Sequence, residues 1–191
     1  MGNQMKPLKS AVLIALLFTA APALAFDDQR AGFILGVGAG FHMLRDHITT
    51  NGYDLASKSE AGLATSFKIG GGITDRILIY YVRNASWFSA PYGNTGKNAI
   101  YTIGLSEVGT TIFISPTAPS GYFLAAVGGG DISTPFEDAT PDTGNALMLG
   151  GGYEYRKNLM FEGTLLATSI PSGNVTLKSA SLQFTINYLF Y

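Results

Sequence analysis

The chain contains no cysteine, few charged residues and only two histidines. Without cysteine it can form no disulfide bond, and it has no cysteine that could carry a lipid behind an export signal. Charged residues make up 13% of the chain and the formal net charge is −1. This balance supplies no basic surface for nucleic acid, and no block of like charge suggests a disordered tail.

Long apolar runs are also missing beyond the N-terminal region. No later segment has 18 apolar residues in a row, so no transmembrane helix is expected there. The chain is nevertheless 47% hydrophobic, with 24 glycines, 12 phenylalanines and 10 tyrosines. A water-soluble exported domain would normally carry more surface charge. A β-barrel in a membrane needs few charges and many aromatic residues at the two interfaces, and this composition fits it.

Residues 5–25 have the three parts of a secretory signal peptide. Two lysines form the basic start, Ala11–Phe18 is the apolar run, and Ala23-Leu24-Ala25 is a small-residue cleavage site. A membrane-spanning helix would need about 20 unbroken apolar residues, and a proline interrupts this segment near its end. We therefore predict a signal peptide over residues 1–25, cleaved near Ala25, and a mature domain over residues 26–191.

The last ten residues, LQFTINYLFY, alternate between apolar and largely polar side chains. The apolar members are every second residue from Leu182 to Phe190, and Gln183, Thr185 and Asn187 lie between them. Successive side chains of a strand point to opposite faces, so this period of two predicts a β-strand. One apolar face and one polar face suit a barrel wall between lipid and a polar lumen.

Seven further segments have the length and pattern of strands. The eight predicted strands are residues 31–41, 61–70, 77–88, 99–115, 121–131, 145–155, 159–169 and 177–191. A long polar loop, His42–Glu60, is expected after the first strand, and longer and shorter connections then alternate. The fourth strand changes its apolar phase, which predicts a β-bulge near Ser106-Glu107. The predicted fold is all-β: an eight-stranded antiparallel up-and-down transmembrane β-barrel with both termini on the periplasmic side.

Together with the export signal and the aromatic last strand, the segment Gly150–Leu166 (GGGYEYRKNLMFEGTLL) resembles the small eight-stranded outer-membrane barrels of the OmpA/OmpX-like and opacity-like kind. The resemblance implies a monomer in the outer membrane of a Gram-negative bacterium, surrounded by lipid and lipopolysaccharide. It also implies biogenesis through periplasmic chaperones and the barrel-assembly machinery. In that family the final aromatic residue is usually in the lipid-facing phase. Here Phe190 is in that phase, and we expect it to act as the insertion signal with Tyr188 and Tyr191 beside it.

If the apolar set of each strand faces lipid, the other set faces the lumen. This predicts a lumen charge network of Lys68, Arg83, Glu107, Glu154, Arg156 and Glu162. Charges of both signs removed from water are expected to pair, and an eight-stranded barrel is only about wide enough for side chains to fill it. A plug of paired side chains is therefore expected, with a narrow pore through the same residues as the alternative. Trp87 and Phe88 are predicted to belong to an interfacial aromatic girdle.

Three glycine triplets occur, at residues 70–72, 128–130 and 150–152. None precedes a Lys-Ser or Lys-Thr pair, so phosphate binding by a P-loop is not expected. In a strand, glycine allows sharp bending and leaves room for a neighbouring aromatic ring. We predict that structural role for all three.

The competing hypothesis is an enzyme that modifies lipid A. Such a site needs a nucleophile, a base and an orienting acid. His42 and His47 are the only histidines, with Asp46 between them; the candidate hydroxyl groups are those of Thr49, Ser57 and Ser59. The deacylases carry their His and Ser two residues apart on one strand, and no His-x-Ser occurs here. A metal site at the two histidines and Asp46 is not expected either, because the spacing alone supplies no third strong ligand. We expect no catalytic residue, metal or cofactor, and a structural or surface-interaction role.

Overall fold

The computed structural model describes residues 29–50, 53–92, 96–137 and 140–191. The predicted signal peptide and its cleavage site lie outside these ranges. All eight predicted strands are present: β1 (Gly32–Thr50), β2 (Tyr53–Thr74), β3 (Ile77–Pro91), β4 (Asn98–Phe113), β5 (Ser120–Ser133), β6 (Asp142–Arg156), β7 (Leu159–Ser172) and β8 (Val175–Phe190). Within these ranges no helix is long and apolar enough to cross a membrane.

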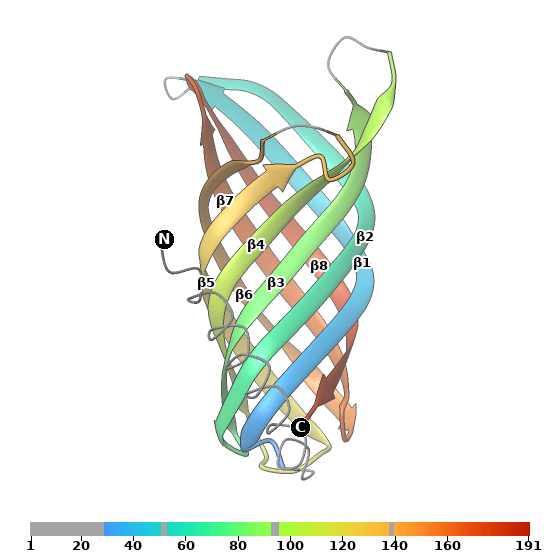
Figure 1. Cartoon of the computed structure of the whole chain (residues 1–191), viewed down its shortest axis with the longest axis vertical. Coiled ribbons are helices and arrows are strands. Elements are labelled where there is room, and N and C mark those ends of the chain that lie inside the picture. The colour runs from blue at the N-terminus through green and yellow to red at the C-terminus, as the bar shows by residue number, and fades with distance from the viewer. Residues whose placement is uncertain (1–28, 51–52, 93–95, 138–139) are drawn as a thin grey trace, which may run out of the picture.

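The sheet closes on itself, because β1 pairs with both β2 and β8. Every strand is antiparallel to its two neighbours, as Figure 1 shows. Following the paired residues once around the barrel from Leu35 leads back to Arg45, a stagger of ten residues. Such a stagger tilts the strands by about 40° from the barrel axis. Closure leaves no sheet edge unpaired, and a hydrocarbon environment requires this of the backbone.

The strands are longer, and the outer connections shorter, than the sequence predicted. β1 has 19 residues and β2 has 22, so the predicted loop His42–Glu60 is wrong and almost all of it is strand. Crossing a membrane takes about 9–11 residues, so these strands continue well beyond one crossing. Polar side chains favour a loop prediction, but a hairpin outside the membrane tolerates them, because hydrogen bonds between its two strands satisfy the backbone.

The lumen contains apolar as well as polar side chains. The larger buried cluster includes Leu78, Tyr80, Leu105, Met148 and Leu189, and a smaller one contains Leu44, Phe88 and Ile103. The outer face carries a second set of apolar side chains, which is exposed. The barrel therefore presents apolar residues to both its faces, and polarity alone does not separate inside from outside.

This double apolar pattern explains an error in β4. Ile103 is 1% exposed and faces the lumen, whereas Val108 is 63% exposed on the outer face. The register of β4 with β3 and with β5 is nevertheless continuous, so the predicted bulge near Ser106-Glu107 is wrong. The apolar residues change face at mid-strand because the outer half of the lumen accepts them.

One glycine triplet makes room for an aromatic ring, as predicted. A Cβ atom at Gly152 would lie 2.4 Å from the hydroxyl oxygen of Tyr122 and 2.3 Å from the carbonyl oxygen of Phe161. Any larger residue at this position would displace the tyrosine, which is buried in the lumen. The glycine thus fixes where Tyr122 points, toward the polar residues described next.

Candidate functional site

A buried ion pair lies in the half of the lumen nearer to the start of β1 and the end of β8. Nζ of Lys68 on β2 lies 2.5 Å from Oε2 of Glu162 on β7, and both side chains are buried. The hydroxyl of Tyr122 donates a second hydrogen bond to the same oxygen, at 3.1 Å. The ammonium group also lies 5.5 Å from the centre of the Tyr80 ring. These two charges, from strands that are not neighbours in the sheet, form a pairing that the sequence predicted.

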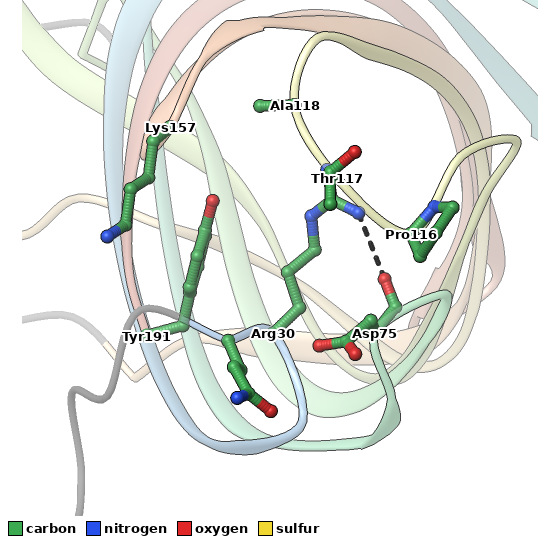
Figure 2. A pocket seen from close by; sticks show the side chains of 8 residues that line it. Arg30, Asp75, Pro116, Thr117, Ala118, Lys157 and Tyr191 are labelled. Atoms are coloured by element: carbon green, nitrogen blue, oxygen red, sulfur yellow. Dashed lines mark hydrogen bonds between the residues drawn. The ribbon is translucent and has the colours of Figure 1, made fainter.

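At the end of the lumen where β1 begins and β8 ends, the mouth is closed by a residue that precedes the first strand. Arg30 forms a buried ion pair with Glu154, and it donates hydrogen bonds of 2.9 Å to the carbonyl oxygens of Asp75 and Ser115. Its guanidinium carbon lies 3.9 Å from the centre of the Phe113 ring. Figure 2 shows Arg30 reaching across the mouth, with its bond to Asp75 dashed. One side chain therefore bonds to β6 and to the turns that connect β2 with β3 and β4 with β5.

The last two residues have different roles in this closure. The side chain of Phe190 is partly exposed on the outer face, in phase with Tyr188. Tyr191 is buried, and its hydroxyl donates a 2.7 Å hydrogen bond to Oε1 of Glu154. Burial, together with this bond to a carboxylate, raises the pKa of the Tyr191 hydroxyl. The terminal tyrosine thus belongs to the closure that Arg30 forms, and Phe190 is the terminal aromatic on the outer face.

Open space in the lumen is found at its ends. A hollow of about 480 Å³ lies outside the closure and is lined by Arg30, Asp75, Lys157 and Tyr191 among others (Figure 2). Beside Lys68, inside the closure, the free space is only about 10 Å³, which is the lower limit for one water molecule. A cavity of about 220 Å³ lies at the outer mouth, lined by Phe88, Tyr101 and Leu177 among others. Between these ends, buried side chains such as Leu105, Met148 and Gln183 occupy the lumen.

Glu107 faces the lumen, as predicted, but it does not join a network. It is 2% exposed, and neither of its carboxylate oxygens has a hydrogen-bond partner within the described ranges. Its neighbour across β3 is the apolar Val82. A buried carboxylate without a partner is destabilising unless it is neutral or meets a ligand.

Arg83 is not in the lumen, and the prediction that placed it there is wrong. Its neighbours Val82 and Asn84 are both buried inside, so Arg83 points to the outer face. There it pairs with Asp131 on β5, and a Cβ atom at Gly104 would lie 2.3 Å from Nη2. Ser106 accepts a 2.9 Å bond from the same guanidinium. The parity argument failed because Tyr81 and Ile79 share the face of Arg83, and their inside neighbours are equally apolar.

Two other predicted placements are also wrong. Phe88 points inward, stacked on Tyr101 with ring centres 5.8 Å apart, because it is adjacent to Trp87 and adjacent strand residues face opposite ways. Trp87 is on the outer face and donates a 2.9 Å hydrogen bond to Thr65. Arg156 is exposed beside the Tyr155 ring at the end of β6, where a register shift interrupts the alternation, so it is no part of a lumen network.

The two histidines lie on opposite faces of β1. His42 is buried in the lumen, where its Nε2 lies 3.1 Å from the carbonyl oxygen of Trp87 and its ring meets the edge of Phe88. His47 pairs in register with Ser57 on β2 and with Lys178 on β8. No hydrogen bond joins His47 to Ser57 among the contacts of the described residues. In those same ranges no three His, Asp or Glu residues gather in a way that could hold a metal ion.

Sequence reasoning missed two residues that organise the charges. Arg30 lies outside the predicted strands, so parity assigned it no face. Asp131 was the last residue of a predicted strand, and its partner Arg83 was assigned to the lumen. The outward position of Arg83 could have been inferred from Ile79 and Tyr81, because residues two apart in a strand share a face and both of these are exposed on the outer face.

No protein-family model matches the chain, and no curated protein is similar enough to count as a relative. Among solved structures, Neisserial surface protein A has a TM-score of 0.51 at 12% identity, with 81% of this chain and 96% of that chain covered. The outer membrane protein OprG from Pseudomonas aeruginosa has a TM-score of 0.49 at 13% identity, covering 86% of this chain and 99% of that one.

The attachment invasion locus protein Ail of Yersinia pestis, solved with the heparin analogue sucrose octasulfate, also has a TM-score of 0.49, at 14% identity. It covers 82% of this chain and 99% of its own. These neighbours are small outer-membrane barrels, and the likeness to Neisserial surface protein A shows that the chain has their fold.

Proposed function

We propose that this chain is a non-enzymatic protein of the Gram-negative outer membrane with a structural or surface-interaction role. The observation that carries the proposal is a closed barrel with an apolar belt outside and a packed lumen inside. The belt includes Phe41, Phe123, Leu149, Phe161 and Ile186, each at least 45% exposed. Water would penalise such a surface, whereas lipid solvates it.

The packed lumen supports a structural role over a pore. The Lys68–Glu162 pair bridges the two walls, and Arg30 with Glu154 closes the periplasmic mouth. An open pore would require both ion pairs to separate inside a low-dielectric interior, which is costly. We infer that the barrel does not conduct ions in its resting state.

The long outer strands support an interaction role at the cell surface. The hairpins of β1–β2 and β3–β4 extend well past the length needed for one crossing, and Figure 1 shows the β3–β4 hairpin standing beyond the other strands. Paired strands hold their side chains at regular positions, which lowers the entropy cost of binding a partner. In this proposal the protein is a monomer surrounded by lipid and lipopolysaccharide, inserted by the barrel-assembly machinery after passage with periplasmic chaperones.

The lipid A-modifying alternative lacks support from the geometry. A hydrolase of this type needs its base within hydrogen-bond reach of a nucleophile. His42 is enclosed in the lumen against Trp87 and Phe88, away from any lipid. His47 does lie opposite Ser57, but their side chains form no hydrogen bond. We therefore propose no catalytic role for either histidine.

One set of measurements on the full chain, expressed in a Gram-negative host, tests this proposal. We expect the protein in the outer-membrane fraction, with faster electrophoretic mobility before boiling than after it. Planar bilayers containing it should show no discrete conductance steps. The mass spectrum of lipid A should be the same with the wild-type protein and with H47A. Recovery in the soluble periplasmic fraction, steady conductance steps, or a lipid A mass change that H47A abolishes would each overturn the corresponding part.

A further inference from the structure

The outer face of β1, β7 and β8 contains two shallow apolar furrows placed end to end. The lower furrow, about 400 Å³, lies between the rings of Phe41, Phe161 and Phe184, with Ala39 and Gly163 leaving the space. The upper furrow, about 440 Å³, continues along these strands, extends onto β2, and is lined by Met43, Ala61, Leu165, Ala180 and Leu182. Each of these side chains points away from the lumen. Together they form an apolar groove that faces the membrane.

The upper furrow ends at a cationic cluster. Arg45, which lines the furrow, is exposed on β1, and Lys178 is exposed on β8. Lys178 pairs in register with His47, and Arg45 pairs with Ala180 two residues away, so the two cations are diagonal neighbours on one face. Cβ atoms in that relation are about 7–8 Å apart or less, which lets two long side chains converge on one group.

These two cations have no ion-pair partner among the side chains that the structure describes. The ion pairs there are Arg30–Glu154, Lys58–Glu60, Lys68–Glu162 and Arg83–Asp131. Asp46 and Glu60, the nearest described acids, have the parity of the lumen and not of the outer face. Serine hydroxyls lie on the other side of the cluster, since Ser59 pairs with Arg45 and Ser57 with His47. The cluster therefore offers positive charge and hydrogen-bond donors to an anion.

The length of the groove matches half of a bilayer. From Ala39 to Arg45 the chain advances six residues, which is about 20 Å along a strand. A tilt of about 40° reduces this to about 15 Å across the membrane. The hydrocarbon core is about 30 Å thick, so one leaflet spans about the same 15 Å. The cations then lie at headgroup depth, directly above a groove as long as one leaflet.

We propose that this groove binds a phosphorylated, acylated glycolipid of the outer leaflet, of the lipid A class. Arg45 and Lys178 hold a phosphate group, Ser57 and Ser59 donate hydrogen bonds to the headgroup, and acyl chains lie in the furrows between Phe41, Phe184 and Leu182. A bare phosphate would use the cations but leave the furrows unused, and a neutral lipid would leave the cations unused. The proposal rests on the membrane placement argued above.

Native mass spectrometry of the purified barrel in mild detergent tests the proposal. The probes are lipid A, the same lipid without its phosphates, and the deacylated phosphorylated disaccharide. We expect wild-type protein to retain lipid A at least tenfold more strongly than either of the other two. The double variant Arg45→Gln/Lys178→Gln should lose at least tenfold in affinity for lipid A and little for the dephosphorylated form.

A second variant tests the furrow independently of charge. In Gly163→Leu the new Cβ would be in ordinary contact with the Phe184 ring, at 3.6 Å, so the side chain fills the lower furrow without strain. We expect a severalfold loss of lipid A binding. Gly129→Leu, on the outer face of β5, and Arg156→Gln, at the other end of the barrel, are the matched controls and should bind normally.

Three results would overturn the proposal: lipid A binding unchanged in the double charge variant, equal losses in the control variants, or full competition by the deacylated disaccharide. Each variant is first checked for mobility before and after boiling. A groove variant that keeps the mobility of the folded barrel but binds less lipid A supports the proposed site. If the wild-type protein itself lacks this mobility, the barrel fold is contradicted instead.

Discussion

Lys68 and Glu162 lie on β2 and β7, which β1 and β8 separate in the sheet, and their charged atoms are 2.5 Å apart in the lumen. They are 94 residues apart in the sequence, and no strand pairing joins β2 to β7. The contact therefore depends on closure of the whole sheet. It is a sensitive report on whether the barrel has formed.

Breaking this pair should destabilise the barrel strongly. Lys68→Met leaves Glu162 charged and buried, with only Tyr122 as a hydrogen-bond donor, so the free energy of unfolding should fall by about 3–5 kcal/mol. The double variant Lys68→Met/Glu162→Met removes both charges and should recover most of the loss. Urea unfolding, followed by electrophoretic mobility, measures both values. An equal loss in the single and double variants would argue against a coupled pair.

The pair at the outer mouth provides the control. Lys58 and Glu60 form an ion pair in which the lysine is largely exposed, so water and salt screen the interaction. Lys58→Met should change the free energy of unfolding by less than about 1 kcal/mol. A loss as large as that of Lys68→Met would show that burial does not set the difference.

Replacing Glu107 should stabilise the protein. Because its carboxylate is buried with no partner among the described residues, Glu107→Met removes a desolvation penalty and should raise the free energy of unfolding by about 1–3 kcal/mol. Glu162→Met, which removes a carboxylate with two donors, should have the opposite sign. The same urea titrations compare the two, and a destabilised Glu107→Met would reveal a partner for Glu107.

Replacing one member of the outward Arg83–Asp131 pair should lower the stability of the barrel, whereas replacing both members should not. Arg83 is the seventh residue of the 15 in β3, so its side chain leaves the backbone near the middle of the strand, on the outer face. Asp131→Leu leaves its guanidinium against lipid without a carboxylate, with Ser106 as its remaining acceptor, and should cost about 2–4 kcal/mol in phospholipid vesicles. The variant Arg83→Leu/Asp131→Leu should be at least as stable as the wild type. A double variant as unstable as the single one would place these residues away from hydrocarbon.

The two terminal aromatics should separate assembly from stability. Phe190→Ser removes the last aromatic of the outer face and should reduce the amount of folded barrel that cells accumulate. Tyr191→Phe loses the hydroxyl, which donates to Glu154 and accepts a 3.4 Å bond from the backbone N–H of Asn158, and should assemble normally, with about 1 kcal/mol less stability. Quantitative immunoblots of unboiled outer membranes give the first comparison, and urea titrations the second. Defective assembly of Tyr191→Phe would assign the insertion signal to that residue instead.

The period of two was enough to find all eight strands, because barrel strands cannot avoid facing two environments. It placed Lys68, Glu154 and Glu162 in the lumen correctly, since near these residues only the outer face of each strand is strongly apolar. It failed at Arg83 and in β4, where apolar residues face both lipid and lumen. It could not find Arg30, which acts through a turn, or the Arg45–Lys178 cluster, which requires the register between the first and last strands.

The most direct test is a scan of single cysteines along β3, from Ile79 to Phe88, with a spin label at each. The chain has no cysteine of its own, so every variant carries one label. In phospholipid vesicles, collision with oxygen should be high at residues 79, 81, 83, 85 and 87 and low at the even positions between them. A profile without this period, or one with the even positions exposed to lipid, would contradict the barrel and the outward position of Arg83 together.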